Sequence, residues 1–159
     1  MTISIRTATP ADVPTIASLI RALSVYEKLE DDVTMTEEKL QASLFGPRPY
    51  AETLLAEEDG EAVGFALFFH NFSTFLAQPG LYLEDLYVHE SHRGKGIGKL
   101  LLVELAKIAV ARSCGRMEWA VLDWNKPAIG FYEKLGARPN SEWTVYRLTG
   151  ESLTRLAGQ

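Results

Sequence analysis

The chain has 159 residues, of which 47% are hydrophobic and 23% are charged, and its net charge at pH 7 is −5. These values are typical of a globular protein, and we expect a single domain over residues 1–159. The acidic balance excludes a globally basic surface for nucleic acid or an anionic membrane. No apolar run approaches the ~18 residues of a membrane helix, and the N-terminal residues do not resemble a secretory leader. The single cysteine, Cys114, excludes an internal disulfide and a cysteine-rich zinc site, so we expect a cytoplasmic protein without membrane or nucleic-acid partners.

Local signals in the first half of the chain predict two helices and three strands. Alternation of apolar and polar residues near the N-terminus is typical of a strand, and Pro10 is typical of a first helical turn. A Thr-x-x-Glu capping pattern begins at Thr34, and the pair Asp59-Gly60 favours a two-residue hairpin turn between two apolar runs. The predicted ranges are strand 3–8, helix 10–28, helix 34–44, strand 52–58 and strand 61–72.

The second half of the chain predicts strands and helices in alternation. A strand enters a glycine-rich loop and a long helix, which we expect Gly115 to close, and Gly136 stops a later, shorter helix. This order of elements predicts an α/β fold with a mixed sheet. The predicted ranges are strand 81–88, helix 96–112, strand 117–122, helix 126–134 and strand 143–148.

The glycine-rich loop RGKGIG is the first candidate binding site. Free backbone N–H groups at the start of a helix favour a phosphate or diphosphate, although a plain tight turn has the same composition. The loop is not a P-loop, because Arg93 stands in place of its first glycine and Leu100 in place of its Ser or Thr. Its third glycine comes one residue too early for a dinucleotide-binding fingerprint. The basic residues His92, Arg93, Lys95 and Lys99 favour an anionic ligand.

Several motifs together resemble one family. The Arg93-x-x-Gly96-x-Gly98 loop after an apolar strand, and the later run GFYEKLGA, resemble the GNAT superfamily of acetyl-CoA-dependent N-acetyltransferases. More narrowly, the segments YEKLEDD, LYLEDLYV, DWNKP and YRLTGESLTRLA resemble the spermidine/spermine (diamine) and thialysine N-acetyltransferases. The resemblance covers nearly the whole chain. It implies a twisted, mostly antiparallel mixed sheet of six to seven strands flanked by helices.

The resemblance also implies acetyl-CoA as cosubstrate. Its pantetheine arm is expected on the backbone of the strand and its pyrophosphate on the glycine loop. His89 and His92 have H-x-x-H spacing but no third ligand, so we expect no metal site. The implied cofactor-binding residues are Leu86, Tyr87, Val88, Arg93, Gly94, Lys95, Gly96, Ile97, Gly98, Lys99, Asn125, Phe131 and Lys134.

Transfer of an acetyl group to an amine requires a neutral amine and a proton for the departing thiolate. By resemblance, Tyr132 supplies that proton as general acid, although a buried aromatic residue on a short helix is the alternative. Glu84 is implied to bind the amine and to help remove its proton through water, and Asp85 is either its partner in the amine site or part of a structural salt bridge. Tyr26 and Glu27 match positions that line the amine site.

We therefore expect an acetyltransferase that acts on a primary amine of a small cationic metabolite, by direct attack within a ternary complex. The loop FSTFLAQPG lacks the acidic residue and tryptophan of the spermidine/spermine enzymes, whereas VLDWN is more similar to the thialysine branch, so both substrate classes stay open. A noncatalytic acyl-CoA-sensing module and a protein or peptide acetyltransferase are the alternatives. The resemblance also implies a homodimer, in which the strand at 143–148 and the tail ESLTRLA contact the partner.

Overall fold

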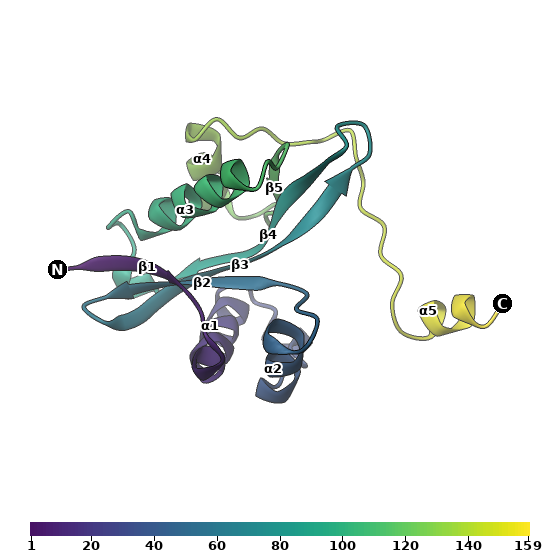
Figure 1. Cartoon of the computed structure of the whole chain (residues 1–159), viewed down its shortest axis with the longest axis horizontal. Helices are drawn as coiled ribbons and strands as arrows, with labels where there is room; N and C mark the ends of the chain where they lie inside the picture. The colour runs from purple at the N-terminus through teal and green to yellow at the C-terminus, as the bar shows by residue number, and fades with distance from the viewer. The chain divides into compact units, whose positions relative to one another are not determined.

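The computed structural model describes all residues from 1 to 159, which divide into two compact units, Met1–Ala120 and Val121–Gln159. The first unit contains the sheet and three helices, and the second contains two helices joined by extended chain (Figure 1). No helix combines the length and the apolar character needed to cross a membrane.

The sheet has five strands in the order β1-β2-β3-β4-β5. Neighbours from β1 to β4 pair antiparallel, and β5 pairs parallel to β4. This confirms the predicted α/β fold with a mixed, mostly antiparallel sheet, although five strands form where six to seven were expected. The strands are β1 (Ile3–Thr7), β2 (Glu52–Glu58), β3 (Glu61–Ser73), β4 (Gln78–Val88) and β5 (Met117–Trp119).

The strand predicted at 143–148 is absent, and the strand predicted at 117–122 ends at Trp119. Residues 143–148 carry the alternating pattern of a strand but pair with no other segment of the chain. A strand needs a hydrogen-bonded neighbour, and sequence alternation alone does not supply one. The missing strand accounts for the lower strand count.

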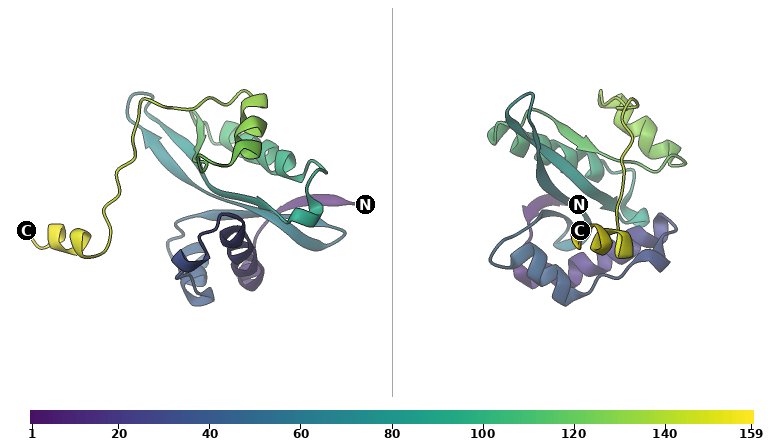
Figure 2. Two further views of the ribbon diagram at one scale, coloured as in Figure 1. Left: turned by 180° about the vertical axis from the view of Figure 1, so that it is seen from behind. Right: turned by 90° about the vertical axis from the view of Figure 1, so that its right-hand side faces the viewer.

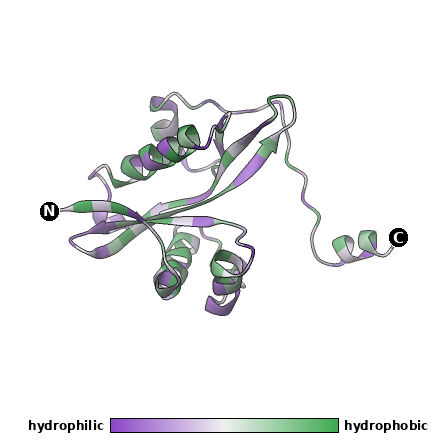
Figure 3. Ribbon diagram, in the orientation of Figure 1, coloured by the Kyte–Doolittle hydropathy of each residue, from purple (hydrophilic) through white to green (hydrophobic).

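Helices cover both faces of the sheet in the first unit. Helices α1 and α2 lie on one face and α3 lies on the other (Figure 1, Figure 2). Hydrophobic and hydrophilic residues alternate along α1 and α3 (Figure 3), as expected for helices with one buried side. The five helices are α1 (Val13–Tyr26), α2 (Glu37–Phe45), α3 (Ile97–Ala111), α4 (Lys126–Lys134) and α5 (Gly150–Ala157).

The helix ends differ from the predicted ones in a few places. A single 3₁₀ turn at Pro10–Asp12 precedes α1, and Thr36 rather than Thr34 caps α2 by accepting a hydrogen bond from the Lys39 N–H. Ser113, not Gly115, holds the left-handed position after α3. Helix α5 was not predicted.

The predicted hairpin between β2 and β3 is confirmed. Asp59 and Gly60 both have positive φ, at 51° and 88°, which is the conformation of a type I′ turn. The Asp59 carboxylate also accepts a hydrogen bond from the Thr2 N–H at 2.8 Å, so the turn is tied to the start of the chain.

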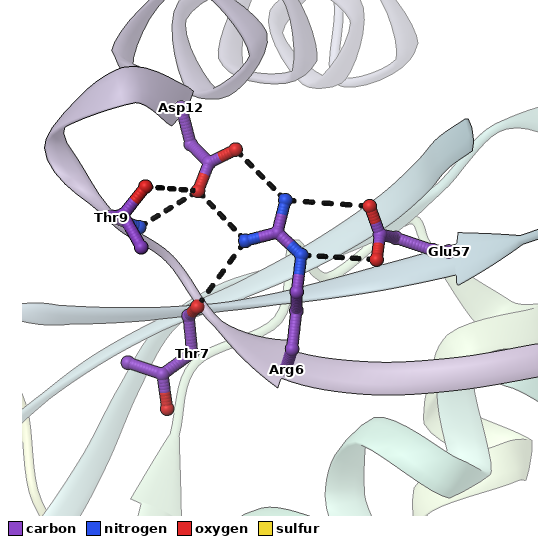
Figure 4. A network of polar contacts seen from close by, with 5 residues as sticks. All are labelled: Arg6, Thr7, Thr9, Asp12 and Glu57. Atoms are coloured by element: carbon purple, nitrogen blue, oxygen red, sulfur yellow. Dashed lines mark hydrogen bonds and ion pairs between the residues drawn. The ribbon is translucent and has the colours of Figure 1, made fainter. Parts of the chain in front are cut away.

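A charged network joins the start of α1 to the edge of the sheet (Figure 4). The Arg6 guanidinium on β1 donates to both carboxylate oxygens of Asp12, at 2.8 and 2.9 Å, and to those of Glu57 on β2, at 3.0 and 3.3 Å. Asp12 in turn accepts from the Thr9 N–H at 2.7 Å. The network therefore fixes the direction in which the chain leaves β1 and enters α1.

A β-bulge interrupts strand β4 at Glu84, so that Leu83 and Asp85, two residues apart, lie on opposite faces of the sheet. Leu83 lies opposite Phe68 and Asp85 lies opposite Leu67, so Glu84 between them has no partner on β3. Phe68 is on the α3 side, where the Arg112 guanidinium lies 5.9 Å from its ring. Leu67 packs against the core beneath α1 and α2. The bulge therefore moves β4 from one face to the other within two residues.

Candidate active site

The two adjacent carboxylates of β4 lie at this bulge. Glu84 is exposed, whereas Asp85 is half-buried on the face that α1 and α2 cover. Asp85 forms no hydrogen bond or ion pair, so the structural salt bridge considered from the sequence is absent. The bulge interrupts the simple alternation of side chains along the strand at this point.

The pKa of Asp85 is raised from 3.8 to about 7, chiefly by burial and in addition by the neighbouring charges of Glu84 and Glu27. Burial also raises the pKa of Glu27. These two carboxyls interact although they come from different elements, since Glu27 is the C-cap of α1 and Asp85 is on β4. Glu27, Glu84 and Asp85 form no ion pair with a basic side chain, so together they favour a positively charged ligand.

The end of α1 fixes the position of Glu27. The Leu29 N–H donates to the Ser24 carbonyl and the Lys28 N–H to the Val25 carbonyl, which is the Schellman pattern of a helix end. Lys28 takes the left-handed conformation that this pattern needs, with φ of 60°. Tyr26 and Glu27, which the sequence assigned to the amine site, therefore lie in a defined helix terminus.

The glycine loop has the geometry of an anion site. Gly94 and Gly96 have φ of 80° and 81°, and Gly96 is the N-cap of α3. The N–H groups of residues 94–99 donate no hydrogen bond in the structure, and no atom lies within 4 Å of where a Cβ would stand on either glycine. Unbonded N–H groups at a helix start suit a diphosphate, so the loop fits the pyrophosphate of acetyl-CoA.

The basic cluster around the loop is partly neutralised. The Lys95 ammonium lies 2.8 Å from the Glu58 carboxylate, and His92 Nε2 lies 3.1 Å from the same carboxylate. Glu58 ends β2 and is buried, with a relative exposure of 9%. Sequence reasoning missed Glu58, although a carboxylate at the end of a buried strand indicates a basic partner.

Beyond the bulge, β4 pairs with β3 along one edge, and its other edge has no strand beside it in the first unit. Strand β5 pairs with β4 only from Leu81 to Leu83. The Val88 carbonyl accepts a hydrogen bond from Arg93 Nε at 2.9 Å. An extended arm with amide groups pairs readily with such an edge, which is compatible with the assignment of residues 86–88 to pantetheine that the resemblance implied.

The remaining predicted residues lie in the second unit, on or beside α4. The side chain of Asn125 is buried and caps α4 by accepting from the Ala128 N–H at 3.4 Å. Tyr132 is half-buried, with its ring 5.6 Å from that of Phe131, and Lys134 is exposed at the end of the helix. Their assigned roles remain predictions.

A second polar cluster lies at the far end of α3. The Arg112 guanidinium binds both oxygens of Glu52, at 2.6 and 2.9 Å, and lies 2.9 Å from His70 Nε2. His70 Nδ1 is 3.0 Å from the Gly80 carbonyl, which requires its proton on Nδ1. No three His, Cys, Asp or Glu side chains are placed to hold a metal ion.

Comparison with known proteins extends these observations. The model of the acetyltransferase (GNAT) family matches residues 17–137. An L-ornithine N5-acetyltransferase of Arabidopsis thaliana is 37% identical, over 96% of this chain and 86% of its own length. A thialysine N-epsilon-acetyltransferase of Bos taurus is 39% identical, over 99% of this chain and 98% of its own length. Among solved structures, an integron cassette protein of V. cholerae superposes with a TM-score of 0.83 and 28% identity, covering 100% of this chain and 99% of its own. The chain belongs to the GNAT acetyltransferase family and is an acetyltransferase that acts on amines.

Proposed function

We propose that this chain transfers an acetyl group from acetyl-CoA to the terminal primary amine of a small cationic metabolite. The observation that carries the proposal is the acidic group formed by Glu27 at the end of α1 and by Glu84 and Asp85 on β4, the strand that leads into the unbonded N–H groups of the glycine loop. The acidic group suits an ammonium ion, and the loop suits a diphosphate. Strand β4 therefore lies between the proposed binding site of the amine and that of acetyl-CoA.

A lysine analogue such as thialysine, or ornithine, is the substrate class that the relatives support. Their names specify thialysine and L-ornithine, each with an amine at the end of a short chain. A spermidine/spermine N1-acetyltransferase-like protein of Homo sapiens is 32% identical over 96% of this chain but only 23% of its own length. Diamines and polyamines are therefore the second substrate class.

In the proposed mechanism the amine nitrogen attacks the acetyl carbonyl directly, within a ternary complex. Glu84 binds the substrate ammonium and accepts its proton through water. Asp85, whose pKa of about 7 lies close to neutral pH, is the neighbouring group able to exchange that proton with solvent. The nitrogen of the tetrahedral adduct loses its second proton to solvent, the carbon–sulfur bond breaks, and Tyr132 protonates the thiolate and regains its own proton from solvent. Asn125, Phe131 and Lys134 complete the proposed set of acetyl-CoA contacts.

The test is release of free CoA from acetyl-CoA with thialysine, ornithine, lysine, putrescine, spermidine, spermine and a lysine peptide. We expect one of the free amines to be the preferred substrate. Loss of a general acid or base costs roughly 10²- to 10⁴-fold in rate, so Tyr132→Phe and Glu84→Gln should each lower kcat by about that factor. Unchanged kcat in Tyr132→Phe would remove the general-acid assignment.

A protein substrate is the competing outcome. A ribosomal-protein-alanine N-acetyltransferase of Brucella melitensis superposes with a TM-score of 0.76 and 25% identity, covering 94% of this chain. The same assay separates the two functions, because a protein acetyltransferase would turn over the peptide faster than any free amine. The exposed acid Glu61 provides a matched control, since Glu61→Gln should leave the rates unchanged with every substrate.

A further inference from the structure

We propose that Arg93 is a positioning residue that joins the glycine loop to the amine-binding wall at the end of α1. Through this connection, acyl-CoA and amine would each bind more tightly when the other is present. The inference rests on the proposed function, which supplies the two ligands. It assigns the Arg93 side chain a task that differs from a simple contact with the pyrophosphate.

The Arg93 side chain is held on three sides. Its guanidinium carbon lies 4.5 Å from the centroid of the Tyr26 ring and 5.5 Å from that of Tyr87, and its Nε donates to the Val88 carbonyl at 2.9 Å. Tyr26 is the last residue of α1, and Tyr87 and Val88 end β4. One side chain therefore contacts the helix and the strand that carry the acidic group.

The backbone of the same residue leads directly into the glycine loop. The Arg93 N–H donates to the Glu90 carbonyl at 3.2 Å, and the unbonded N–H groups of the loop begin at the next residue, Gly94. Any movement of the loop that accompanies binding of a diphosphate therefore acts on the ring of Tyr26. Glu27 follows Tyr26 directly and is fixed by the Schellman pattern, so its carboxylate moves with that ring.

The chemistry of the contact requires arginine. A guanidinium stacks on an aromatic face and donates in its own plane through Nε at the same time, whereas a lysine ammonium cannot do both. The Nη atoms of Arg93 form no hydrogen bond in the structure, so they remain able to bind a phosphate oxygen while the tyrosine contacts persist. A phosphate bound there would be linked through one rigid group to α1.

The experiment measures the dissociation constant of CoA by calorimetry, with and without a saturating amine, for the wild type, Tyr26→Leu, Tyr26→Phe and Arg93→Lys. Tyr26→Leu removes the ring without changing the glycine loop. A cation–π contact of this kind corresponds to about a 3- to 10-fold change in binding, so Tyr26→Leu should weaken CoA binding by that factor. It should also reduce the tightening of CoA binding that the amine produces. Tyr26→Phe keeps the ring that Arg93 contacts, so the amine should still tighten CoA binding in this variant.

Arg93→Lys removes the guanidinium from the same contact, so it tests the inference even if Tyr26→Leu does not fold. We expect a higher KM for the amine as well as for acetyl-CoA, with kcat changed less than either. An increase confined to the KM for acetyl-CoA, or an unchanged CoA dissociation constant in folded Tyr26→Leu, would overturn the inference. Failure of the proposed function has a different signature, namely wild-type protein that binds CoA but releases none from acetyl-CoA with any amine.

Discussion

At the scale of one residue, the half-buried carboxyl of Asp85 lowers the stability of the folded protein at neutral and higher pH. Its folded-state pKa of about 7 lies above its ordinary value of 3.8. The folded protein therefore holds the proton over a range in which the unfolded chain has lost it. Stability is unaffected below about pH 4, falls as the pH rises toward 7, and stays lowered above that.

We predict that Asp85→Asn stabilises the protein above neutral pH. The amide needs no proton to stay neutral, so its free energy of unfolding at pH 8 should exceed that of the wild type by at least about 1 kcal/mol. Thermal denaturation from pH 4 to pH 8 checks this, and the difference should grow with pH. The exposed Asp31 serves as control, because Asp31→Asn should show no such trend.

The sequence identified the acidic residues of the proposed amine site but not the residue that binds the basic side chains of the glycine loop. Glu84, Asp85, Tyr26 and Glu27 were named because their motifs match a family, and the structure brings Glu27, Glu84 and Asp85 into one group. The partners of the loop were not identified. Glu58 is far from His92 and Lys95 in the sequence, and no local pattern indicates that a hairpin end lies beside the loop.

Helix α3 gives a prediction at the scale of one element. The Cys114 N–H donates to the Ala109 carbonyl and the Ser113 N–H to the Val110 carbonyl, so the helix ends in a second Schellman pattern. Ser113 has φ of 58°, a conformation that is costly for any residue with a Cβ. Ser113→Gly should therefore raise the free energy of unfolding by about 0.5 to 1 kcal/mol, as measured by urea denaturation. Ser113→Ala keeps the strain and should give no gain.

The network at the start of α1 gives a prediction with the opposite pH dependence. Hydrogen bonds from Arg6 hold the pKa of Asp12 well below its ordinary value of 3.8. Their stabilisation is complete above about pH 4 and is lost as the pH falls through the lowered pKa. Asp12→Asn should cost about 1 to 2 kcal/mol at pH 7, and the variant and the wild type should converge in acid. In an Arg6→Met background the cost should be smaller, which a double-mutant cycle measures.

The elements that were predicted correctly have local causes. The hairpin at Asp59-Gly60 and the helix at 126–134 depend on the conformational preferences of a few adjacent residues. The prediction of a strand at 143–148 was wrong, because a strand forms only where another segment is placed to pair with it, and the local sequence does not show this. The bulge at Glu84 was not foreseen, since its neighbours alternate as a regular strand would.

At the scale of the whole molecule, the C-terminal segment has a large unpaired apolar surface. Trp143, Val145 and Tyr146 are 77%, 89% and 93% exposed, and Leu153 and Leu156 of α5 are also exposed. Extended chain with unpaired backbone groups and apolar side chains favours pairing with another strand. We propose that a second copy of the chain covers this segment, as the resemblance to dimeric acetyltransferases implied.

Sedimentation at micromolar concentration should then show a dimer. The double substitution Val145→Glu and Tyr146→Glu places two charges in the proposed contact and should yield a monomer. The control Glu61→Lys, on the exposed end of β3, should remain dimeric. A monomeric wild type would contradict the proposal. The expected single domain over residues 1–159 also remains a prediction.

Because of the bulge in β4, the proposed catalytic residue Glu84 is not needed for the packing of the sheet. Leu83 and Tyr87 are buried in cores on opposite sides of the sheet, and they keep those places because Glu84 is an insertion into an otherwise regular pleat. Removal of that one residue would leave a plain strand in which every neighbour keeps its side. The Glu84 carboxylate therefore adds to the strand without a place in either core, and a chain that lacks Glu84 should still form the sheet.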